Sequence, residues 1–319
     1  MNSVFKQFLR LPSNFETFRR FYTPRRALLY VPGDDVKKIT KTESLDVDCV
    51  AMDCEDGVAI NKKDVARETI RGILDKGKPN KSRKYDWGVR ANSIDSGLCE
   101  EDLKSLLTAK NLPDTVLLPK VQNCDEIKWF SDKVSSIISG NNSVNLIIYI
   151  ETAMSFINLP SICKTAVDLS KNSKFRPCAL VYGGDDFVAS IGAIKTEENT
   201  ETLYARQKLV LVAKAYNLQA IDMVYIKYKD LEGLKKQSEQ GLHMGFTGKQ
   251  VIHPGQVPVV QNAFLPTSSQ VEWAQGLLKS FKEHQKTGKG AFTYRGSMID
   301  MPTMKQAQNI IEIVNLAQK

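Results

Sequence analysis

The sequence is poor in the residues and motifs that build several common functional sites. Its three histidines, His243, His253 and His284, lie far apart, which argues against a histidine-rich metal centre. Its six cysteines form no CxxC pair and no zinc-ligand spacing, so we expect buried, reduced thiols. No GxGxxG motif follows the first strand-like run, which weighs against a dinucleotide-binding fold. No apolar run approaches the roughly 18 residues of a membrane span, so no membrane partner is expected.

The composition is that of a globular protein with a large core. Of the 319 residues, 42% are hydrophobic and 25% are charged, which suits one large α/β barrel or two ordinary domains. The net charge is +8, and residues 1–26 contribute much of it, with six basic side chains against the single acid Glu16. This pattern predicts a mitochondrial targeting peptide over residues 1–24 and a mature protein in the matrix. A disordered nucleic-acid-binding arm is the alternative.

Without that segment the chain is only mildly basic. This suits a polyanionic ligand, but it is no nucleic-acid footprint, so no nucleic-acid partner is expected.

Short strand-like apolar runs alternate with amphipathic helical stretches along most of the chain. The runs cover residues 27–31, 49–53, 87–91, 115–119, 146–150, 179–182, 219–222 and 245–247. A doubly wound sheet usually stops near six strands, whereas these eight match a (β/α)₈ TIM barrel. We therefore predict an α/β barrel as the catalytic domain over residues 25–265.

A C-terminal helical extension over residues 266–319 is predicted to follow the barrel. A helix is expected over residues 271–283, and a last helix is expected after Pro302. Between them lies a glycine-spaced loop, residues 288–301, that fits a mobile lid. An oligomer contact is the alternative interpretation of this loop.

Two acidic residues mark the centre of the predicted barrel. Glu151 directly follows the run 146–150, and Asp186 follows the run 179–182 after two glycines and Asp185. Apolar residues at helical spacing after Pro160 complete a strand–helix–strand unit. Two carboxylates that leave the same ends of neighbouring strands suit Mg²⁺, which usually takes one or two protein carboxylates.

Polar groups also follow most of the other predicted strands. In chain order these groups are Pro32-Gly33-Asp34-Asp35, Asp53, Glu55, Asp56, Arg90, Asn92, Lys120, Glu151, Asp186, Asp222 and Ile252-His253-Pro254. Because catalytic groups of such barrels lie at the C-terminal ends of the strands, we expect an active site there. Polar surface loops without a common role are the alternative.

Several short motifs resemble those of a known enzyme family. The motifs are Arg26-Ala27-Leu28-Leu29-Tyr30-Val31-Pro32-Gly33, Asp53-Cys54-Glu55-Asp56-Gly57-Val58, Val89-Arg90-Ala91-Asn92, Leu118-Pro119-Lys120, Ile150-Glu151-Thr152-Ala153, Gly183-Gly184-Asp185-Asp186-Phe187, residues 248–256 and residues 296–302. Together they resemble the citrate lyase β-subunit-like branch of the HpcH/HpaI aldolase superfamily. The resemblance covers residues 25–317. Ala91 departs from the isoleucine frequent in the wider family, but Arg90 and Asn92 remain in place.

The resemblance implies a (β/α)₈ barrel homotrimer that cleaves an acyl-CoA, (3S)-citramalyl-CoA, into acetyl-CoA and pyruvate with Mg²⁺. It implies that Glu151 and Asp186 bind the metal and that Arg90 is the substrate arginine. By the same resemblance, Asp300 is the catalytic acid/base, and its lid is contributed in trans by a neighbouring subunit. The positions implied to contact the CoA ester are Tyr30, Lys37, Ile252 and His253.

The chemistry of such a cleavage suits these residue types. Splitting a β-hydroxy thioester leaves negative charge on a thioester enolate, which Arg90 could stabilise and Asp300 could protonate. Arg90 in a structural salt bridge to Glu55 or Asp56, and Asp300 as an ordinary loop acid, are the alternatives.

Three other functions compete with this cleavage. They are a malate or β-methylmalate synthase that condenses acetyl-CoA or propionyl-CoA with glyoxylate, a non-catalytic barrel subunit, and an aldolase that acts on free acids. The last is disfavoured by Lys37 and Lys38, which follow Pro32-Gly33 as an expected anion site.

Overall fold

The computed structural model describes residues 23–78, 85–285 and 292–317. The chain divides into two compact units at Gln261 and Asn262, four residues before the boundary expected from the sequence. The first unit spans Arg25–Gln261, and the second contains the C-terminal extension. The predicted targeting peptide falls almost wholly outside the described residues.

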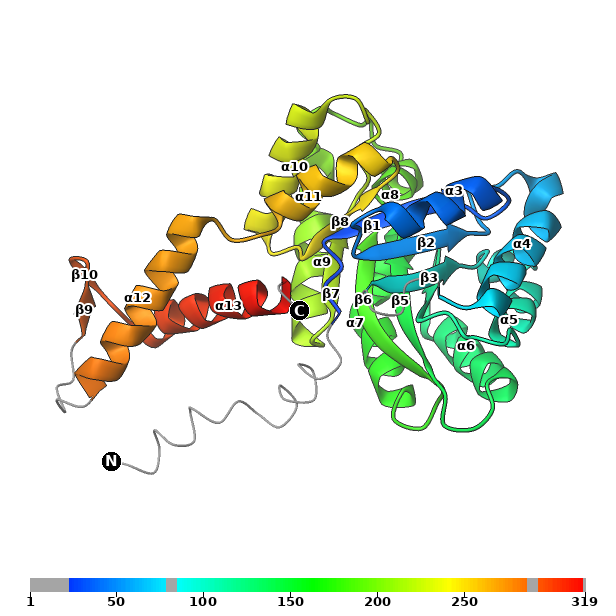
Figure 1. The fold of residues 1–319 in the computed structure, drawn as a ribbon, viewed down its shortest axis with the longest axis horizontal. Helices are drawn as coiled ribbons and strands as arrows, with labels where there is room; N and C mark the ends of the chain where they lie inside the picture. The colour runs from blue at the N-terminus through cyan, green and yellow to red at the C-terminus, as the bar shows by residue number, and fades with distance from the viewer. Residues whose placement is uncertain (1–22, 79–84, 286–291, 318–319) are drawn as a thin grey trace. The chain divides into compact units, whose positions relative to one another are not determined.

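The first unit is a closed barrel of eight strands that follow one another around the ring in chain order (Figure 1). All neighbouring strands are parallel, and β1 pairs with β8 to close the ring. The strands are β1 (Ala27–Pro32), β2 (Cys49–Asp53), β3 (Asp86–Arg90), β4 (Thr115–Leu118), β5 (Val144–Ile150), β6 (Phe175–Tyr182), β7 (Gln219–Asp222) and β8 (Gly248–Val251). The predicted (β/α)₈ fold is confirmed.

Helices connect the strands and form the outer layer of the barrel (Figure 1). They are α3 (Val36–Lys41), α4 (Lys63–Lys76), α5 (Cys99–Leu107), α6 (Cys124–Ile137), α7 (Ala153–Leu169), α8 (Gly184–Ile191), α9 (Leu203–Ala215), α10 (Leu231–Met244) and α11 (Val257–Ala263). Short 3-10 turns are η1 (Thr42–Ser44), η2 (Ile60–Lys62), η3 (Ile94–Ser96), η4 (Thr200–Thr202) and η5 (Pro254–Gln256). Helix α4 shows why they pack: Ala66, Ile70 and Leu74 recur every four residues and are all buried.

Side chains fill the inside of the barrel. One buried cluster takes alternate residues from single strands, such as Cys49 and Ala51 of β2 and Ile147 and Tyr149 of β5. Alternate residues of a strand share one face, so this cluster is the inward layer of the ring. The barrel is therefore a packed core, and the space for chemistry lies at its C-terminal mouth, where the strands end.

The prediction was wrong for the eighth strand. The predicted run 245–247 links α10 to β8, and Gly245 ends α10 with a positive φ of 97°. The true strand carries the polar residues Lys249 and Gln250, which are buried, so an apolar pattern could not reveal it. Gly248 opens the strand because a Cβ there would lie 1.9 Å from the Arg25 carbonyl oxygen.

The start of the helix after β5 also differs from the prediction. Helix α7 begins at Ala153, well before Pro160, which it contains. Thr152 and Ser155 form a capping box that satisfies the first backbone N–H groups of the helix. This local hydrogen bonding starts the helix directly after Glu151 and thereby fixes the backbone that carries this residue.

The second unit is a helical hairpin with a small sheet between its helices. It contains α12 (Ser268–Gln285), β9 (Thr293–Tyr294), β10 (Ser297–Met298) and α13 (Met301–Ala317). Both predicted helices are present, α12 is longer than expected, and α13 begins one residue before Pro302. The helices share a buried cluster that includes Leu277 and Ala307. Residues 286–291, which include part of the predicted lid loop, lie outside the described residues.

The described part of the predicted lid is an ordered hairpin. Strands β9 and β10 pair antiparallel, and Arg295 and Gly296 between them have φ of 49° and 83°. Two consecutive positive φ values are typical of the tight type I′ hairpin turn. Tyr294 packs over α12, where Gly276 makes room, since a Cβ there would lie 2.1 Å from the Tyr294 hydroxyl. The hairpin places Asp300 directly before α13.

Two expectations from composition can be compared with the structure. All six cysteines are free; Cys49, Cys54, Cys99 and Cys163 are buried, and the other two are half-buried. Among the described residues, none of the helices combines the length and the apolar character needed to cross a membrane.

Candidate active site

The centre of the C-terminal mouth is an arginine held by two carboxylates. Asp53 and Arg90 are register partners at the ends of β2 and β3. Arg90 donates from Nε to Asp53 Oδ1 at 2.7 Å and from Nη2 to Oδ2 at 2.6 Å. Its Nη1 lies 2.9 Å from Glu55 Oε2. Burial lowers the pKa of Arg90, but the charge of Asp53 and its hydrogen bonds raise it well above the ordinary value, so the guanidinium stays charged.

The loop after β2 fixes Asp53 in turn. The backbone N–H groups of Glu55 and Gly57 donate to its two carboxylate oxygens at 2.8 and 2.9 Å. A Cβ on residue 57 would lie 2.5 Å from Asp53 Oδ2, so this close approach requires glycine. Arg90 therefore meets a carboxylate whose position is already set, and its planar fork is held in one orientation.

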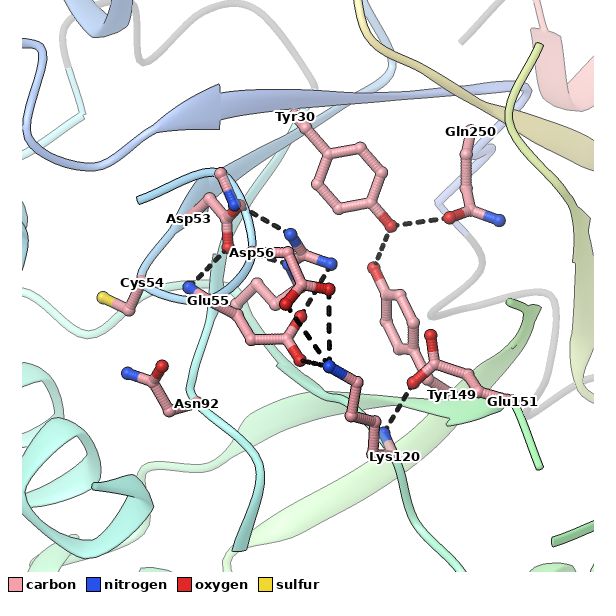
Figure 2. Close-up of polar contacts among 12 residues, drawn as sticks. Tyr30, Asp53, Cys54, Glu55, Asp56, Asn92, Lys120, Tyr149, Glu151 and Gln250 are labelled. Carbon is pink, nitrogen blue, oxygen red and sulfur yellow. Dashed lines mark hydrogen bonds and ion pairs between the residues drawn. The ribbon is translucent and has the colours of Figure 1, made fainter. Parts of the chain in front are cut away.

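Lys120 joins the acidic loop after β2 to the end of β4. Its Nζ lies 2.8 Å from Glu55 Oε1 and 3.3 Å from Asp56 Oδ1, and Figure 2 shows this contact group. Glu55 thus bridges Lys120 and Arg90. Burial raises the pKa of Glu55, and the two cations oppose this rise. The salt bridge from Arg90 to Glu55, the alternative noted from the sequence, is present, but Asp56 pairs with Lys120 instead.

Glu151 is a further buried acid of the mouth. It is buried at the end of β5, and its Oε2 accepts the backbone N–H of Lys120 at 2.7 Å. Burial, followed by the nearby charges of Glu55 and Asp186, raises the pKa of Glu151 to about 8. A Cβ on residue 183 would lie 2.3 Å from Glu151 Oε1, so Gly183 provides the space for this carboxylate.

Asp186 lies close enough to Glu151 for their charges to interact. It sits in the first turn of α8 and is half-exposed, whereas its neighbour Asp185 is exposed and pairs with Lys195. Burial raises the pKa of Asp186, and Lys120 opposes that rise. The structure therefore brings both predicted metal ligands to the same mouth.

The donors present fit magnesium. Among the described residues, no group of three or more His, Cys, Asp or Glu side chains is arranged to hold a metal. Magnesium does not need such a group, because one or two carboxylates with water and substrate oxygens complete its shell. Glu151 Oε1 accepts no hydrogen bond from the described residues and is free to ligate. A cation there would also offset the charges of Glu55 and Asp186 that act on Glu151.

Tyr149, Tyr30 and Gln250 form a chain of hydrogen bonds inside the barrel, next to Arg90. The Tyr30 hydroxyl lies 2.5 Å from the Tyr149 hydroxyl and 2.8 Å from Gln250 Oε1 (Figure 2). Gln250 Nε2 donates to the carbonyl oxygens of Tyr182 and Asp222, so its Oε1 must be the acceptor for Tyr30. The Arg90 guanidinium lies 4.5 Å from the centre of the Tyr30 ring, a cation–π contact. The predicted substrate residue Tyr30 therefore contacts the Arg90 guanidinium through its ring.

Sequence reasoning gave no role to Tyr149, Gln250 or Lys120 in holding the site. Tyr149 lies inside β5 and outside the quoted motifs. Gln250 lies inside β8 and within the motif of residues 248–256, but nothing in that motif indicates its contact with Tyr30. Lys120 could be recognised from the sequence as a polar strand end and as part of the Leu118-Pro119-Lys120 motif, but its two contacts depend on the fold.

Two of the predicted polar strand ends, Asn92 and Asp222, pair with residues of the outer helices. The Asn92 backbone N–H and its Nδ2 both donate to Asp102 of α5, at 2.7 and 2.8 Å. Asp222 is fully buried and forms a two-point ion pair with Arg206 of α9. Each of these two residues therefore has a partner in the helical layer.

Apart from Tyr30 of β1, the residues expected to contact the CoA ester lie outside the barrel strands. Lys37 is exposed on α3, and Lys38 beside it pairs with Asp35 at 3.1 Å, which reduces the charge available at the expected anion site. Ile252 and His253 are exposed directly after β8. His253 accepts from the Gly255 N–H at 3.0 Å through Nδ1, and its ring lies 5.1 Å from that of Tyr228.

Asp300 belongs to the second unit and lies directly before α13. Its Oδ1 accepts from the Thr303 N–H at 2.9 Å and from the Thr303 hydroxyl at 2.6 Å. These hydrogen bonds lower the pKa of the exposed Asp300. In this unit alone the residue is a helix cap, and any catalytic contact would have to be made by its exposed carboxylate.

Comparisons with known proteins agree with the barrel fold. The sequence profile of the HpcH/HpaI aldolase/citrate lyase family matches residues 26–254. The chain is 51% identical over 295 residues to the mitochondrial citramalyl-CoA lyase of Homo sapiens, which covers 92% of this chain and 86% of that protein.

Two solved structures from Mycobacterium tuberculosis share the fold. Protein CitE in complex with magnesium, acetoacetate and coenzyme A has a TM-score of 0.70 and 24% identity, and the match covers 92% of this chain and 98% of that one. The citrate lyase β subunit complexed with oxaloacetate and magnesium has a TM-score of 0.62 and 25% identity. That match covers 78% of this chain and 100% of the other chain.

Proposed function

Because the chain belongs to the HpcH/HpaI aldolase/citrate lyase family, we propose that it is a magnesium-dependent lyase that cleaves (3S)-citramalyl-CoA into acetyl-CoA and pyruvate. The observation that carries this proposal is the pairing of Glu151 and Asp186 with the charged Arg90 at one barrel mouth. The 51% identity to the human citramalyl-CoA lyase supports the substrate. The magnesium bound by the related citrate lyase β subunit supports the cofactor.

The reaction is a retro-Claisen cleavage whose atoms balance without an oxidant. The carbon–carbon bond between the α and β carbons breaks, the β-hydroxyl loses its proton and becomes the ketone of pyruvate, and the α carbon becomes the enolate of acetyl-CoA. Protonation of that carbon then gives acetyl-CoA. When bound, magnesium would be held by Glu151 and Asp186 and would polarise oxygens of the pyruvyl half.

Arg90 is the residue placed to stabilise the enolate oxygen. Three of its N–H groups engage Asp53 and Glu55, so two of the five donors of a guanidinium remain for a substrate. The network around it is formed before substrate arrives, so little reorganisation accompanies the build-up of charge. Tyr30 supports the guanidinium from its ring face.

The remaining substrate contacts and the acid come from more exposed residues. Tyr30, Lys37, Ile252 and His253 contact the thioester and its CoA in this proposal, and Asp300 supplies the proton to the enolate carbon. The exposed carboxylate of Asp300 is reached by a barrel mouth of a neighbouring subunit in a homotrimer. The mature protein acts in the mitochondrial matrix after loss of residues 1–24.

The test is product analysis by mass spectrometry. Purified protein is incubated with (3S)-citramalyl-CoA, (3S)-malyl-CoA or a hydroxyacyl-CoA without the second carboxylate, each with Mg²⁺ or EDTA. Acetyl-CoA and pyruvate should form from (3S)-citramalyl-CoA with Mg²⁺ and not with EDTA. A parallel reaction of acetyl-CoA or propionyl-CoA with glyoxylate measures the synthase alternative. A faster condensation than cleavage would favour that alternative, and no reaction at all would favour a non-catalytic barrel.

A further inference from the structure

Lys120 has a backbone conformation that is rare for a residue with a side chain. Its φ is 54°, in the left-handed region that glycine and asparagine adopt far more readily. Strained residues of this kind cluster at functional sites and persist only where the surroundings hold them. With this conformation Lys120 makes two separate contacts at the barrel mouth, one through its backbone and one through its side chain.

The backbone contact sets the position of Glu151. The Lys120 N–H donates to Glu151 Oε2 at 2.7 Å, and Gly183 packs against the other side of the same carboxylate. The carboxylate is clamped between them, and the oxygen that remains for a ligand is Oε1. A shift of the Lys120 backbone would therefore rotate the carboxylate that the proposed function assigns to the metal.

The side-chain contact sets the position of Glu55. The Lys120 Nζ lies 2.8 Å from Glu55 Oε1, while Arg90 Nη1 lies 2.9 Å from Glu55 Oε2. Glu55 is buried, so it depends on these two cations. Without the ammonium, Glu55 would keep only Arg90 and would no longer be fixed from both sides.

We propose that Lys120 is a positioning residue with two separable roles, an inference that rests on the proposed function. Its left-handed backbone binds Glu151 Oε2 and thereby orients Oε1 toward the metal, and its ammonium holds Glu55 and, through it, Arg90. Glycine or asparagine would adopt the backbone with less strain but would lack the ammonium. A lysine at a left-handed position is therefore explained only if both contacts are used.

Neutral substitutions separate the backbone role from the charge. Lys120→Asn tolerates the left-handed region, Lys120→Met keeps a long unbranched side chain, and Lys120→Val is β-branched and tolerates it poorly. All three lose the same charge, so its direct effect on Mg²⁺ cancels among them. Isothermal titration calorimetry of Mg²⁺ without substrate should give a dissociation constant about tenfold larger for Lys120→Val than for Lys120→Asn. Lys120→Met should lie between them.

The turnover number reports the role of the charge. Lys120→Arg, which keeps the charge, should stay close to the parent protein, whereas Lys120→Asn and Lys120→Met should lose about tenfold in kcat with little change in KM. Circular dichroism and the melting temperature verify folding. Lys120→Leu, also a poor left-handed residue, replaces Lys120→Val if the latter does not fold.

The outcomes distinguish this inference from the proposed function. Equal Mg²⁺ affinity in the asparagine and valine variants would overturn the backbone role, and an unchanged kcat in the neutral variants would overturn the role of the ammonium. If the parent protein binds no Mg²⁺ and is fully active in EDTA, the proposed function itself fails. If the parent binds Mg²⁺ and cleaves its substrate, only the variant series decides the role of Lys120.

Discussion

Arg90 and Asp53 meet in a two-point ion pair at the ends of adjacent strands, with Nε to Oδ1 at 2.7 Å and Nη2 to Oδ2 at 2.6 Å. Both side chains are almost fully buried, with exposed fractions of 10% and 1%. A planar fork fits this geometry, and an ammonium on a flexible stem cannot reproduce it. The pair therefore determines where the two free N–H groups of Arg90 point.

Arg90→Lys should lower kcat by about 100-fold or more, because it removes donors that act on the developing enolate. Steady-state kinetics should show a fall in kcat larger than any rise in KM. Arg71→Lys is the matched control, since Arg71 binds Asp75 and Ser105 in the outer helices. A change confined to KM would reduce the role of Arg90 to binding of the ground state.

Glu151→Gln and Asp186→Asn should each lower activity by about 10³-fold or more while the protein stays folded, because neutral amides are poor Mg²⁺ ligands. The assay is cleavage at saturating Mg²⁺ with a melting curve for each variant. Asp185→Asn is the control, since Asp185 is exposed and pairs with Lys195. Rates near those of the parent in both ligand variants, or full activity in EDTA, would remove the metal from the mechanism.

Gly183→Ala should weaken Mg²⁺ binding, because the new methyl group would lie 2.3 Å from Glu151 Oε1 and displace it. Calorimetric titration of Mg²⁺ measures the effect. Gly72→Ala, on an exposed face of α4 with nothing within 4 Å of the new methyl group, should bind Mg²⁺ normally and be more stable by about 0.5–1 kcal/mol. Equal Mg²⁺ affinity in both variants would show that Glu151 can move without loss.

A protein that starts at Pro24 should keep its full turnover number, because residues 1–24 are predicted to be shed on import. A protein that starts at Ala27 should be less stable by about 3–5 kcal/mol, because it leaves the buried Asp86 without Arg25. It also loses the pair between Arg26 and Asp48, at 2.8 Å. Melting temperatures and cleavage rates of the two proteins test this. Loss of activity with an intact fold on removal of residues 1–23 would contradict the targeting assignment.

Asp300 should act on the barrel of a neighbouring subunit, since it lies on a separate unit and its carboxylate is exposed. Asp300→Asn provides a sound barrel with an inactive lid, and Arg90→Ala provides the reverse. Co-refolded equimolar mixtures should regain activity in about a quarter of their sites if cyclic assembly is random. Each variant alone sets the background. Verified mixed oligomers that stay at that background would show that the lid acts on its own barrel.

The sequence by itself determined the barrel and the position of its main charged groups. Seven of the eight strands were located because their runs are apolar or follow a clear turn, and strand ends in a parallel barrel must meet at one mouth. Glu151 and Arg90 could therefore be assigned to a common site before any geometry was available. The capping of α13 by Asp300 is also local, because it involves only Asp300 and Thr303, three residues apart in the sequence.

Only the tertiary structure decided which of these groups hold one another. From the strand pattern alone, Asp53, Glu55 or Asp56 could pair with Arg90. The β2–β3 register and the loop N–H groups place Asp53 against the guanidinium, and Glu55 is its second partner. Asn92 and Asp222 pair instead with Asp102 and Arg206, which lie in the outer helices. These choices depend on the reach of side chains between segments far apart in the chain, which periodicity does not encode. The positive φ of Lys120 follows from the same packing and from no property of lysine.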